Sequence, residues 1–105
     1  DSLVGNIASE TFSRFNLDMV FLGTHGMDKE FGFSSPNLDE AETNREVIRR
    51  AAKVVVLADS TKWGIRGFSS FADFEKADLV ITSKGLRSER LEILRNRVKE
   101  VRVAK

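Results

Sequence analysis

The sequence predicts an α/β fold with a mainly parallel sheet, and two observations lead to this prediction. The first is the apolar run at 54–58, which is rich in valine and contains no polar side chain. Such a run is typical of a strand that is buried on both faces, as parallel sheets require. The second is the alternation of strand patterns at 19–22, 54–58 and 79–81 with helical patterns between them. This alternation indicates βαβ units.

The first third of the chain is predicted to contain a helix, a strand and a loop. A helix over 6–15 is indicated by apolar residues at helical spacing, namely Ile7, Ala8, Phe12 and Phe15. The strand at 19–22 follows and ends at Gly23. We expect the next residues to form a glycine-rich loop, which contains Gly26, Gly32 and Pro36.

A second helix is predicted to begin after Asn37. The Asn37 side chain can act as an N-cap, and Glu40 follows three residues later in the capping-box position. The apolar stripe of this helix comprises Ala41, Val47, Ile48, Ala51 and Ala52. We expect the helix to end near Lys53, just before the long apolar strand.

The second half of the chain is predicted to contain an irregular stretch, a strand, a helix and an edge strand. The stretch 64–74 carries three phenylalanines that we expect in the core or at a subunit contact, namely Phe68, Phe71 and Phe74. After the strand at 79–81, Ser88 is expected to cap a helix whose apolar residues are Leu91, Leu94 and Val98. The alternation of Val101 and Val103 with charged residues predicts the edge strand.

Composition limits the classes of protein and site. The 105 residues suffice for one domain, and the absence of cysteine excludes disulfides and thiolate metal sites. The absence of cysteine also fits a reducing compartment, so we expect a cytoplasmic protein. No apolar stretch approaches the length of a membrane span, so we expect no contact with a membrane. Residues 45–105 are mainly basic, but acidic side chains are interspersed, which favours a solvated helix face over a nucleic-acid-binding surface.

Three predicted strands end in turns of small and polar residues, at 23–26, 59–62 and 82–85. A right-handed parallel sheet brings these ends to one edge, where ligands bind in open α/β sheets. Gly23 and Gly26 flank the dipeptide of the first turn, so that its backbone can approach a ligand closely. Lys62 provides a positive charge suited to phosphate. Together the turns predict a site for a polyol phosphate, without a metal ion.

The turn at 59–62 is the strongest single signal. A carboxylate, two hydroxyls and an ammonium group come directly after the buried strand, as Asp59, Ser60, Thr61 and Lys62. Taken alone, these residues also fit a solvated loop with a helix cap. The two further polar turns at the same predicted edge favour a ligand site.

Four segments of the chain resemble the effector-sensing domain of DeoR-type bacterial transcriptional repressors. They are FLGTHGMD at 21–28, GFSSPNLDEAE at 32–42, LADSTKWG at 57–64 and LVITS at 79–83. The resemblance runs from about Leu3 to Ala104, and the motifs occur in the expected order and at the expected spacings.

This resemblance implies a three-layer sandwich, a fold shared with ribose-5-phosphate isomerase and glucosamine-6-phosphate deaminase. It implies a sugar phosphate as effector and contact with DNA through an N-terminal winged helix-turn-helix. If the first βα units of the sheet are missing, a strand edge and an apolar surface lose their cover, so we expect the chain to form a homo-oligomer. That DNA-binding unit, the first βα units of the sheet and a Gly-Thr-Thr-like phosphate loop are not found in the sequence. Residues 1–105 are therefore expected to form the C-terminal part of a single sensor domain.

The resemblance also favours a sensor over an enzyme, because the chain can be compared with isomerases of the same fold. Pentose-phosphate isomerases of this fold carry a catalytic acid after the strand that corresponds to 19–22, whereas the turn here contains none. Since isomerisation needs a base near a carbon-bound proton, we predict no catalytic residue, no enzymatic activity and no cofactor. The alternatives are a fragment of a sugar-phosphate isomerase or deaminase, and a partner-binding domain with an emptied pocket. The retained Lys62 argues against the emptied pocket.

The predicted effector-binding residues are Gly23, Thr24, His25, Gly26, Glu40, Asp59 and Lys62. Glu40 either binds sugar hydroxyls, as the resemblance implies, or closes the capping box with Asn37. Asp59 is interpreted as a residue that orients neighbouring N–H groups or Lys62. Trp63 lines the pocket or packs over the end of the sheet.

Overall fold

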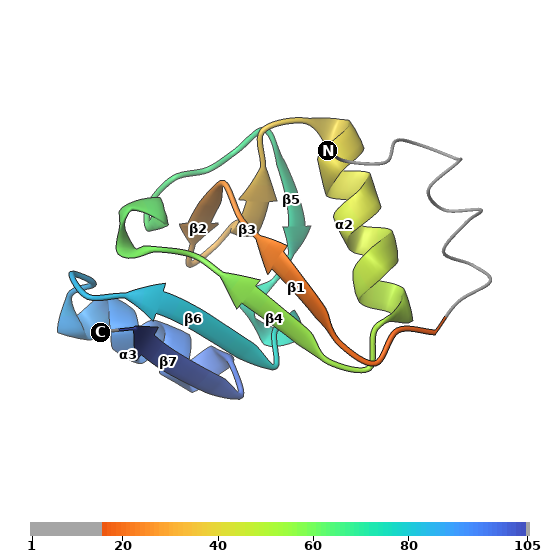
Figure 1. Cartoon of the computed structure of the whole chain (residues 1–105). Coiled ribbons are helices and arrows are strands. Elements are labelled where there is room, and N and C mark those ends of the chain that lie inside the picture. Colours follow the sequence, from red (N-terminus) through yellow and green to blue (C-terminus); the bar gives the residue numbers. More distant parts are fainter. Residues whose placement is uncertain (1–15, 105) are drawn as a thin grey trace.

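The computed structural model describes residues 16–104, so the helix predicted over 6–15 lies outside the described residues. Four strands form a parallel sheet in the order β1-β4-β6-β7 (Figure 1), namely β1 (Val20–Gly23), β4 (Val54–Leu57), β6 (Leu79–Ser83) and β7 (Glu100–Ala104). A smaller antiparallel sheet has the order β2-β3-β5, with β2 (Gly26–Asp28), β3 (Gly32–Ser35) and β5 (Ser69–Ala72). The predicted α/β fold with a mainly parallel sheet is confirmed.

Helical segments connect these strands, namely α2 (Leu38–Arg50), η1 (Ser60–Lys62), η2 (Phe74–Lys76) and α3 (Ser88–Arg97). None of the helices in the described range is long and apolar enough to cross a bilayer. The start of α2 is as predicted, because the Asn37 side chain accepts a hydrogen bond from the Glu40 N–H at 2.9 Å. The helix ends at Arg50, earlier than predicted, because Ala51 adopts an extended conformation and forms a parallel bridge with Leu17.

The glycine-rich loop and the irregular stretch of the sequence prediction are wrong, since both contain strands of the antiparallel sheet. Gly26 pairs with Ser34 between β2 and β3, and the 64–74 stretch contains β5, which pairs with β3. Gly32 has a positive φ of 75°, and a Cβ on it would collide with the Ala72 carbonyl. The glycine that indicated a loop thus permits two strands to approach each other.

The predicted cap of the last helix is also wrong. Arg87, not Ser88, occupies the N-cap position of α3, and no side-chain hydrogen bond caps this helix. The Arg87 carbonyl instead accepts hydrogen bonds from the N–H groups of Arg90 at 3.0 Å and Leu91 at 2.9 Å. The predicted final strand is confirmed as β7, which lies at the edge of the sheet beside β6.

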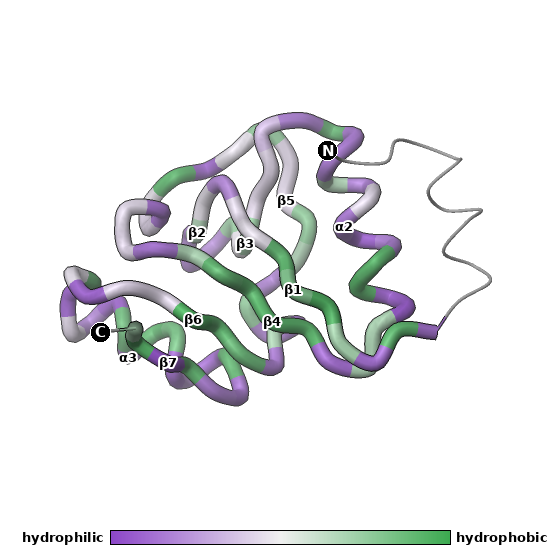
Figure 2. Tube along the Cα trace, viewed as in Figure 1, coloured by the Kyte–Doolittle hydropathy of each residue, from purple (hydrophilic) through white to green (hydrophobic). Residues whose placement is uncertain are grey.

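The core lies between the parallel sheet, the helices and the antiparallel sheet, and Figure 2 shows the apolar strands that contribute to it. Its members include Ala41 of α2, Val54, Val56 and Val80 of the sheet, Phe74 of η2, and Leu94 and Val98. Phe74 is fully buried against Phe33, with ring centroids 5.0 Å apart. Of the three phenylalanines predicted in the core or at a subunit contact, Phe71 and Phe74 are in the core, whereas Phe68 is 74% exposed.

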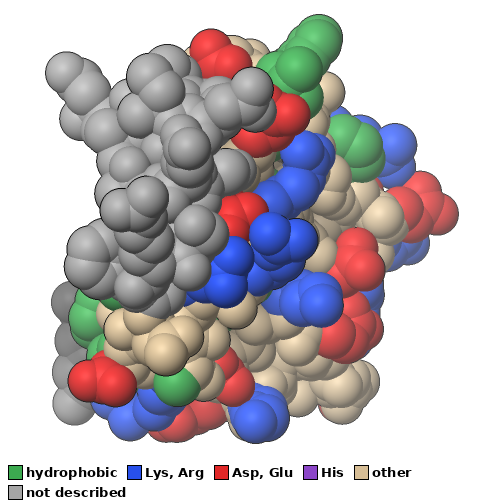
Figure 3. Space-filling model, turned by 90° about the vertical axis from the view of Figure 1, so that its right-hand side faces the viewer, with side chains coloured by type: hydrophobic (Ala, Val, Ile, Leu, Met, Phe, Trp, Pro, Cys, Tyr) green, Lys and Arg blue, Asp and Glu red, His purple; other side chains and the backbone are tan. Residues whose placement is uncertain are grey.

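Basic side chains on the outer face of α2 lie close to acidic ones. Figure 3 shows Lys and Arg side chains gathered there beside Asp and Glu side chains. Within α2, Glu46 accepts hydrogen bonds from Arg49 at 2.7 Å and from Arg50 at 3.2 Å. Such a mixture of charges is typical of a helix face in contact with solvent.

Arg97 joins three parts of the fold. Its guanidinium donates two hydrogen bonds to the Glu75 carboxylate, at 2.7 and 2.8 Å, and one to the Lys29 carbonyl at 2.5 Å. It also lies over the Phe74 ring, 4.8 Å from its centroid. The hydrogen bonds from Arg97, together with one from the backbone of Glu75 itself and the positive charge of Arg97, lower the pKa of Glu75 from 4.5 to about 2. The contacts connect α3 to η2 and to the segment between β2 and β3.

We expect the Glu75–Arg97 interaction to stabilise the fold at neutral pH and to be lost in acid. The pKa of Glu75 is lower in the folded state, so its contribution is present above about pH 4.5 and disappears as the pH falls towards about 2. Urea unfolding of wild type and Glu75→Gln should therefore give different midpoints at neutral pH, and the difference should shrink as the pH is lowered to about 2. In an Arg97→Ala background the Glu75→Gln change should have no effect at either pH. A wild-type advantage that is independent of pH would contradict this prediction.

Candidate functional site

The three polar turns lie at one edge of the parallel sheet, as predicted. The register pairs Gly23 with Leu57 and Leu57 with Ile81, so that β1, β4 and β6 end side by side. Three hydrogen bonds join the second turn to the third, one of them from the Ser83 hydroxyl to the Ser60 hydroxyl at 3.3 Å. The Ser60 N–H donates to the Ser83 hydroxyl at 2.8 Å, and the Ser60 hydroxyl donates to the Lys84 carbonyl at 3.0 Å.

The first turn uses most of its polar groups internally. The Thr24 hydroxyl donates to the Gly26 carbonyl at 2.8 Å and accepts from the Ser34 N–H at 3.3 Å. The His25 N–H donates to the Ser34 carbonyl at 2.9 Å, while its side chain is exposed. The turn is thus held against β3, and the His25 imidazole is the part of it that a ligand can reach.

The two glycines of the first turn have different surroundings. A Cβ on Gly23 would meet no atom within 4 Å, so the space beside this residue is open. Gly26 is buried, and a Cβ on it would collide with the Ile65 carbonyl. The backbone of Gly26 therefore packs against Ile65 of the same chain, whereas Gly23 remains accessible to a ligand.

Asp59 caps the short helix η1. Its carboxylate accepts hydrogen bonds from the Thr61 hydroxyl and, at 3.0 Å, from the Thr61 N–H. The hydrogen bonds from Thr61, together with the nearby charge of Lys62, lower the pKa of Asp59. The carboxylate is therefore ionised at neutral pH, and it orients the turn that carries Lys62.

Lys62 is half-buried at the end of η1. Its ammonium group forms no hydrogen bond or ion pair with any residue in the 16–104 range. The turn itself is anchored, because Trp63 forms a bridge with Met27 and packs 5.9 Å from the Phe74 ring. The Gly64 N–H adds a hydrogen bond to the Met27 carbonyl at 2.7 Å. A fixed backbone thus presents a cation that acts on Asp59 through its charge but forms no ion pair among the described residues.

Glu40 comes from a different element, the first turn of α2. Its N–H is bonded to the Asn37 side chain, and its carboxylate has no hydrogen bond or ion pair among the described residues. Of the two hydrogen bonds of the predicted capping box, the one to the Asn37 side chain is therefore present, and the return bond to the Glu40 carboxylate is not seen among the described residues. No hydrogen bond in the described part of the chain connects Glu40 to the three turns.

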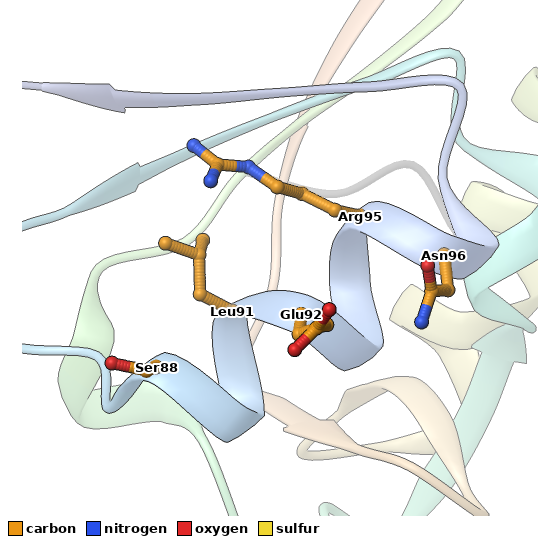
Figure 4. Close-up of a pocket in the computed structure, with 5 residues that line it drawn as sticks. All are labelled: Ser88, Leu91, Glu92, Arg95 and Asn96. Atoms are coloured by element: carbon orange, nitrogen blue, oxygen red, sulfur yellow. The ribbon is translucent and has the colours of Figure 1, made fainter.

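A hollow of about 340 Å³ lies at the ends of β4, β6 and β7, and it is lined by Leu57, Ala58, Asp59, Ile81, Thr82, Ser83 and Ala104. Of the predicted site residues it contains Asp59. The sequence analysis did not select Ser60 and Ser83, although both lie in turns that it placed at this edge. A second hollow, of about 360 Å³, follows one face of α3 (Figure 4) and shares no residue with the turns.

Residues 1–84 match the family model of the DeoR C terminal sensor domain. The chain belongs to this family. The resemblance noted in the sequence is therefore confirmed, and the parallel sheet with its polar edge is the scaffold of a DeoR-type sensor domain.

Curated relatives of this DeoR-family chain are transcriptional regulators by name. The chain is 43% identical to the HTH-type transcriptional regulator GlpR of Haloferax volcanii over 91 residues, which is 87% of the chain and 36% of the relative. It is 33% identical to the putative aga operon transcriptional repressor of Escherichia coli O157:H7, over 95% of the chain and 37% of the relative. It is 25% identical to the glycerol-3-phosphate regulon repressor of Escherichia coli K12, over 76% of the chain and 32% of the relative. The chain thus spans about a third of the length of the relatives it matches.

Proposed function

We propose that residues 1–105 are the C-terminal part of the sensor domain of a cytoplasmic DeoR-type repressor, and that this part binds a phosphorylated sugar or polyol. The observation that carries this proposal is the unpaired ammonium of Lys62 on an anchored turn at the carboxyl edge of the sheet. Such a cation strengthens the binding of a phosphate, because charge-assisted hydrogen bonds are stronger than neutral ones. The name of one relative, the glycerol-3-phosphate regulon repressor, supports this class of effector.

The remaining edge residues suit the hydroxyl groups of the same ligand. Gly23 leaves open space next to its backbone, and the exposed His25 imidazole can donate or accept a hydrogen bond. The ionised Asp59 and the Ser83 hydroxyl lie at the hollow beside the second turn. In this proposal Thr24 and Gly26 support the first turn, and Glu40 contacts the ligand from α2.

The ligand would regulate a DNA-binding helix-turn-helix elsewhere in the parent repressor. An effector that binds one conformation of the sensor more tightly shifts the population towards that conformation. DNA affinity then changes by the same coupling free energy. In this scheme residues 1–105 form the single domain that binds the effector, and the helix-turn-helix binds DNA.

We predict that the protein does not interconvert aldose and ketose phosphates. Isomerisation requires a base that removes a carbon-bound proton, and the 23–26 turn contains no carboxylate. Asp59 is a weak base here, because hydrogen bonds from Thr61 lower its pKa. Incubation with pentose and hexose phosphates, followed by NMR, should show binding without conversion. Turnover that Asp59→Asn or Lys62→Ala abolishes would favour the alternative, an isomerase or deaminase fragment.

A further inference from the structure

Ser60 connects the second turn of the polar edge to the third. Its N–H donates to the Ser83 hydroxyl at 2.8 Å, and its hydroxyl donates to the Lys84 carbonyl at 3.0 Å. The Ser83 hydroxyl donates in turn to the Ser60 hydroxyl at 3.3 Å. Backbone and side-chain groups of this one serine are thus bonded to two consecutive residues of the third turn, which fixes the second turn in both distance and orientation.

The third turn is shaped for this contact. Gly85 has a positive φ of 111°, and a Cβ on it would lie 3.0 Å from the Ser60 hydroxyl oxygen. Glycine adopts this conformation readily and leaves room for the serine. The backbones of the two segments stay together as far as the Ala58 N–H, which donates to the Ile81 carbonyl at 3.0 Å. Beyond that point, every hydrogen bond between the two turns in the 16–104 range involves Ser60.

Ser60 is connected to Lys62 through the short helix η1. The two residues begin and end this helix, and the Trp63 N–H donates to the Ser60 carbonyl at 3.4 Å. On its other side, Trp63 packs on Phe74 and forms a bridge with Met27. Lys62 therefore lies between two anchors, and Ser60 is the anchor that contacts the third turn.

Lys62 and Ser83 offer complementary groups to one ligand. The Lys62 ammonium forms no hydrogen bond or ion pair with any described residue. Ser83 lines the hollow at the ends of β4, β6 and β7. Its hydroxyl already donates to Ser60, so it can accept a hydrogen bond from a ligand. Ser60 is not among the described residues that line this hollow, so its influence on a ligand is indirect.

We propose that Ser60 is a positioning residue, which sets the spacing between Lys62 and Ser83 for a ligand that contacts both. This inference rests on the proposed function. The phosphate of the ligand lies at Lys62, and a hydroxyl of its carbon skeleton donates to Ser83. The class of ligand is therefore a phosphate ester with a free hydroxyl. Because hydrogen bonds weaken steeply away from their preferred geometry, a loosened turn weakens the ligands that use both contacts.

Two probes separate this role from a general effect on the site. Glycerol 3-phosphate carries both groups, whereas inorganic phosphate reaches Lys62 without the contact to Ser83. Calorimetric titration of the full chain should show that Ser60→Ala binds glycerol 3-phosphate roughly two- to ten-fold more weakly, the range for one neutral hydrogen bond. The affinity of the same variant for inorganic phosphate should change by less than about two-fold.

Three further variants complete the titration. Ser60→Thr keeps the hydroxyl and should bind both probes as wild type does. Lys62→Ala should weaken both probes, because each places its phosphate at this residue. Ser88→Ala is the matched control, since Ser88 is exposed and lines the separate hollow on α3, and it should change neither affinity.

Trp63 reports the position of the turn without a ligand, because it follows Lys62 and is the only tryptophan of the sequence. Quenching of its fluorescence by acrylamide should increase in Ser60→Ala and stay at the wild-type value in Ser60→Thr. Unchanged quenching in Ser60→Ala would overturn the positioning role, whether or not a ligand binds.

The titrations provide a second way to overturn the proposal. Equal losses of affinity for both probes in Ser60→Ala would mean that the serine acts on the site as a whole. An unchanged affinity for glycerol 3-phosphate would mean that it has no effect on the ligand. A wild type that binds neither probe would contradict the proposed function instead. In that case, increased Trp63 quenching in Ser60→Ala would still support Ser60 as the residue that holds the turn.

Discussion

Replacing Phe74 by alanine is expected to lower the free energy of unfolding by about 3–5 kcal/mol, the range for truncating a buried phenylalanine. The ring is fully buried, and it contacts Phe33, Trp63 and the Arg97 guanidinium. Its removal leaves a cavity at the point where η2, α3 and both sheets meet. Urea or thermal unfolding, followed by circular dichroism, measures the effect.

Phe68→Ala is the matched control for this prediction. Phe68 lies six residues earlier but is 74% exposed, so its truncation should change stability by less than about 0.5 kcal/mol. Similar losses for the two variants would mean that Phe74 is less important to the core than its burial indicates.

The Phe74→Ala variant should also bind the effector more weakly. Trp63 packs on Phe74 and follows Lys62 in the chain, so loss of the Phe74 ring should displace the turn that carries Lys62.

Replacing Lys62 by alanine is expected to weaken effector binding by roughly 1.5–3 kcal/mol, the range for hydrogen bonds to charged groups. This corresponds to roughly a ten- to hundred-fold loss of affinity. The ammonium is unpaired among the described residues, so its removal leaves no buried partner without a hydrogen bond, and the fold should be unaffected. Calorimetric titration with a panel of sugar and polyol phosphates measures the change.

Lys84→Ala provides the control for the ligand site. Lys84 lies in the third turn of the same edge but is exposed, so its truncation should have a smaller effect on affinity. In the full-length parent, DNA binding without effector should survive both substitutions. Equal affinities of wild type and Lys62→Ala would remove the central residue of the proposed site, while the family and the fold would stand.

Local signals in the sequence were sufficient for several elements. The valine run of β4 is apolar on both faces, and the Asn37 cap needs only the N–H three residues later. The meeting of the three polar turns also followed from the sequence, because parallel strands with right-handed crossovers leave little choice of arrangement. Asp59 illustrates the same point within the site, since it caps a helix within its own turn.

Other features depended on residues that are distant in the sequence. β5 exists because it pairs with β3, and nothing in the 64–74 stretch indicates that partner. Glycine is required at positions 26 and 32 because the carbonyls of Ile65 and Ala72 lie where a Cβ atom would be. The sequence shows only that glycines are frequent in this segment, which is also typical of a loop. The position of Arg97 in a helical pattern is typical of a surface residue, yet its guanidinium donates hydrogen bonds to the Glu75 carboxylate and the Lys29 carbonyl.

The sequence by itself thus determined the fold class, the family and the edge at which a ligand site would lie. These follow from hydrophobic periodicity, from caps within one turn, and from motifs at fixed spacing. Only the tertiary structure decided which edge residues remain accessible, because accessibility depends on contacts between distant segments. The Thr24 hydroxyl and the Gly26 backbone contact other segments of the fold, whereas the space beside Gly23 is open and the Lys62 ammonium has no ion pair among the described residues.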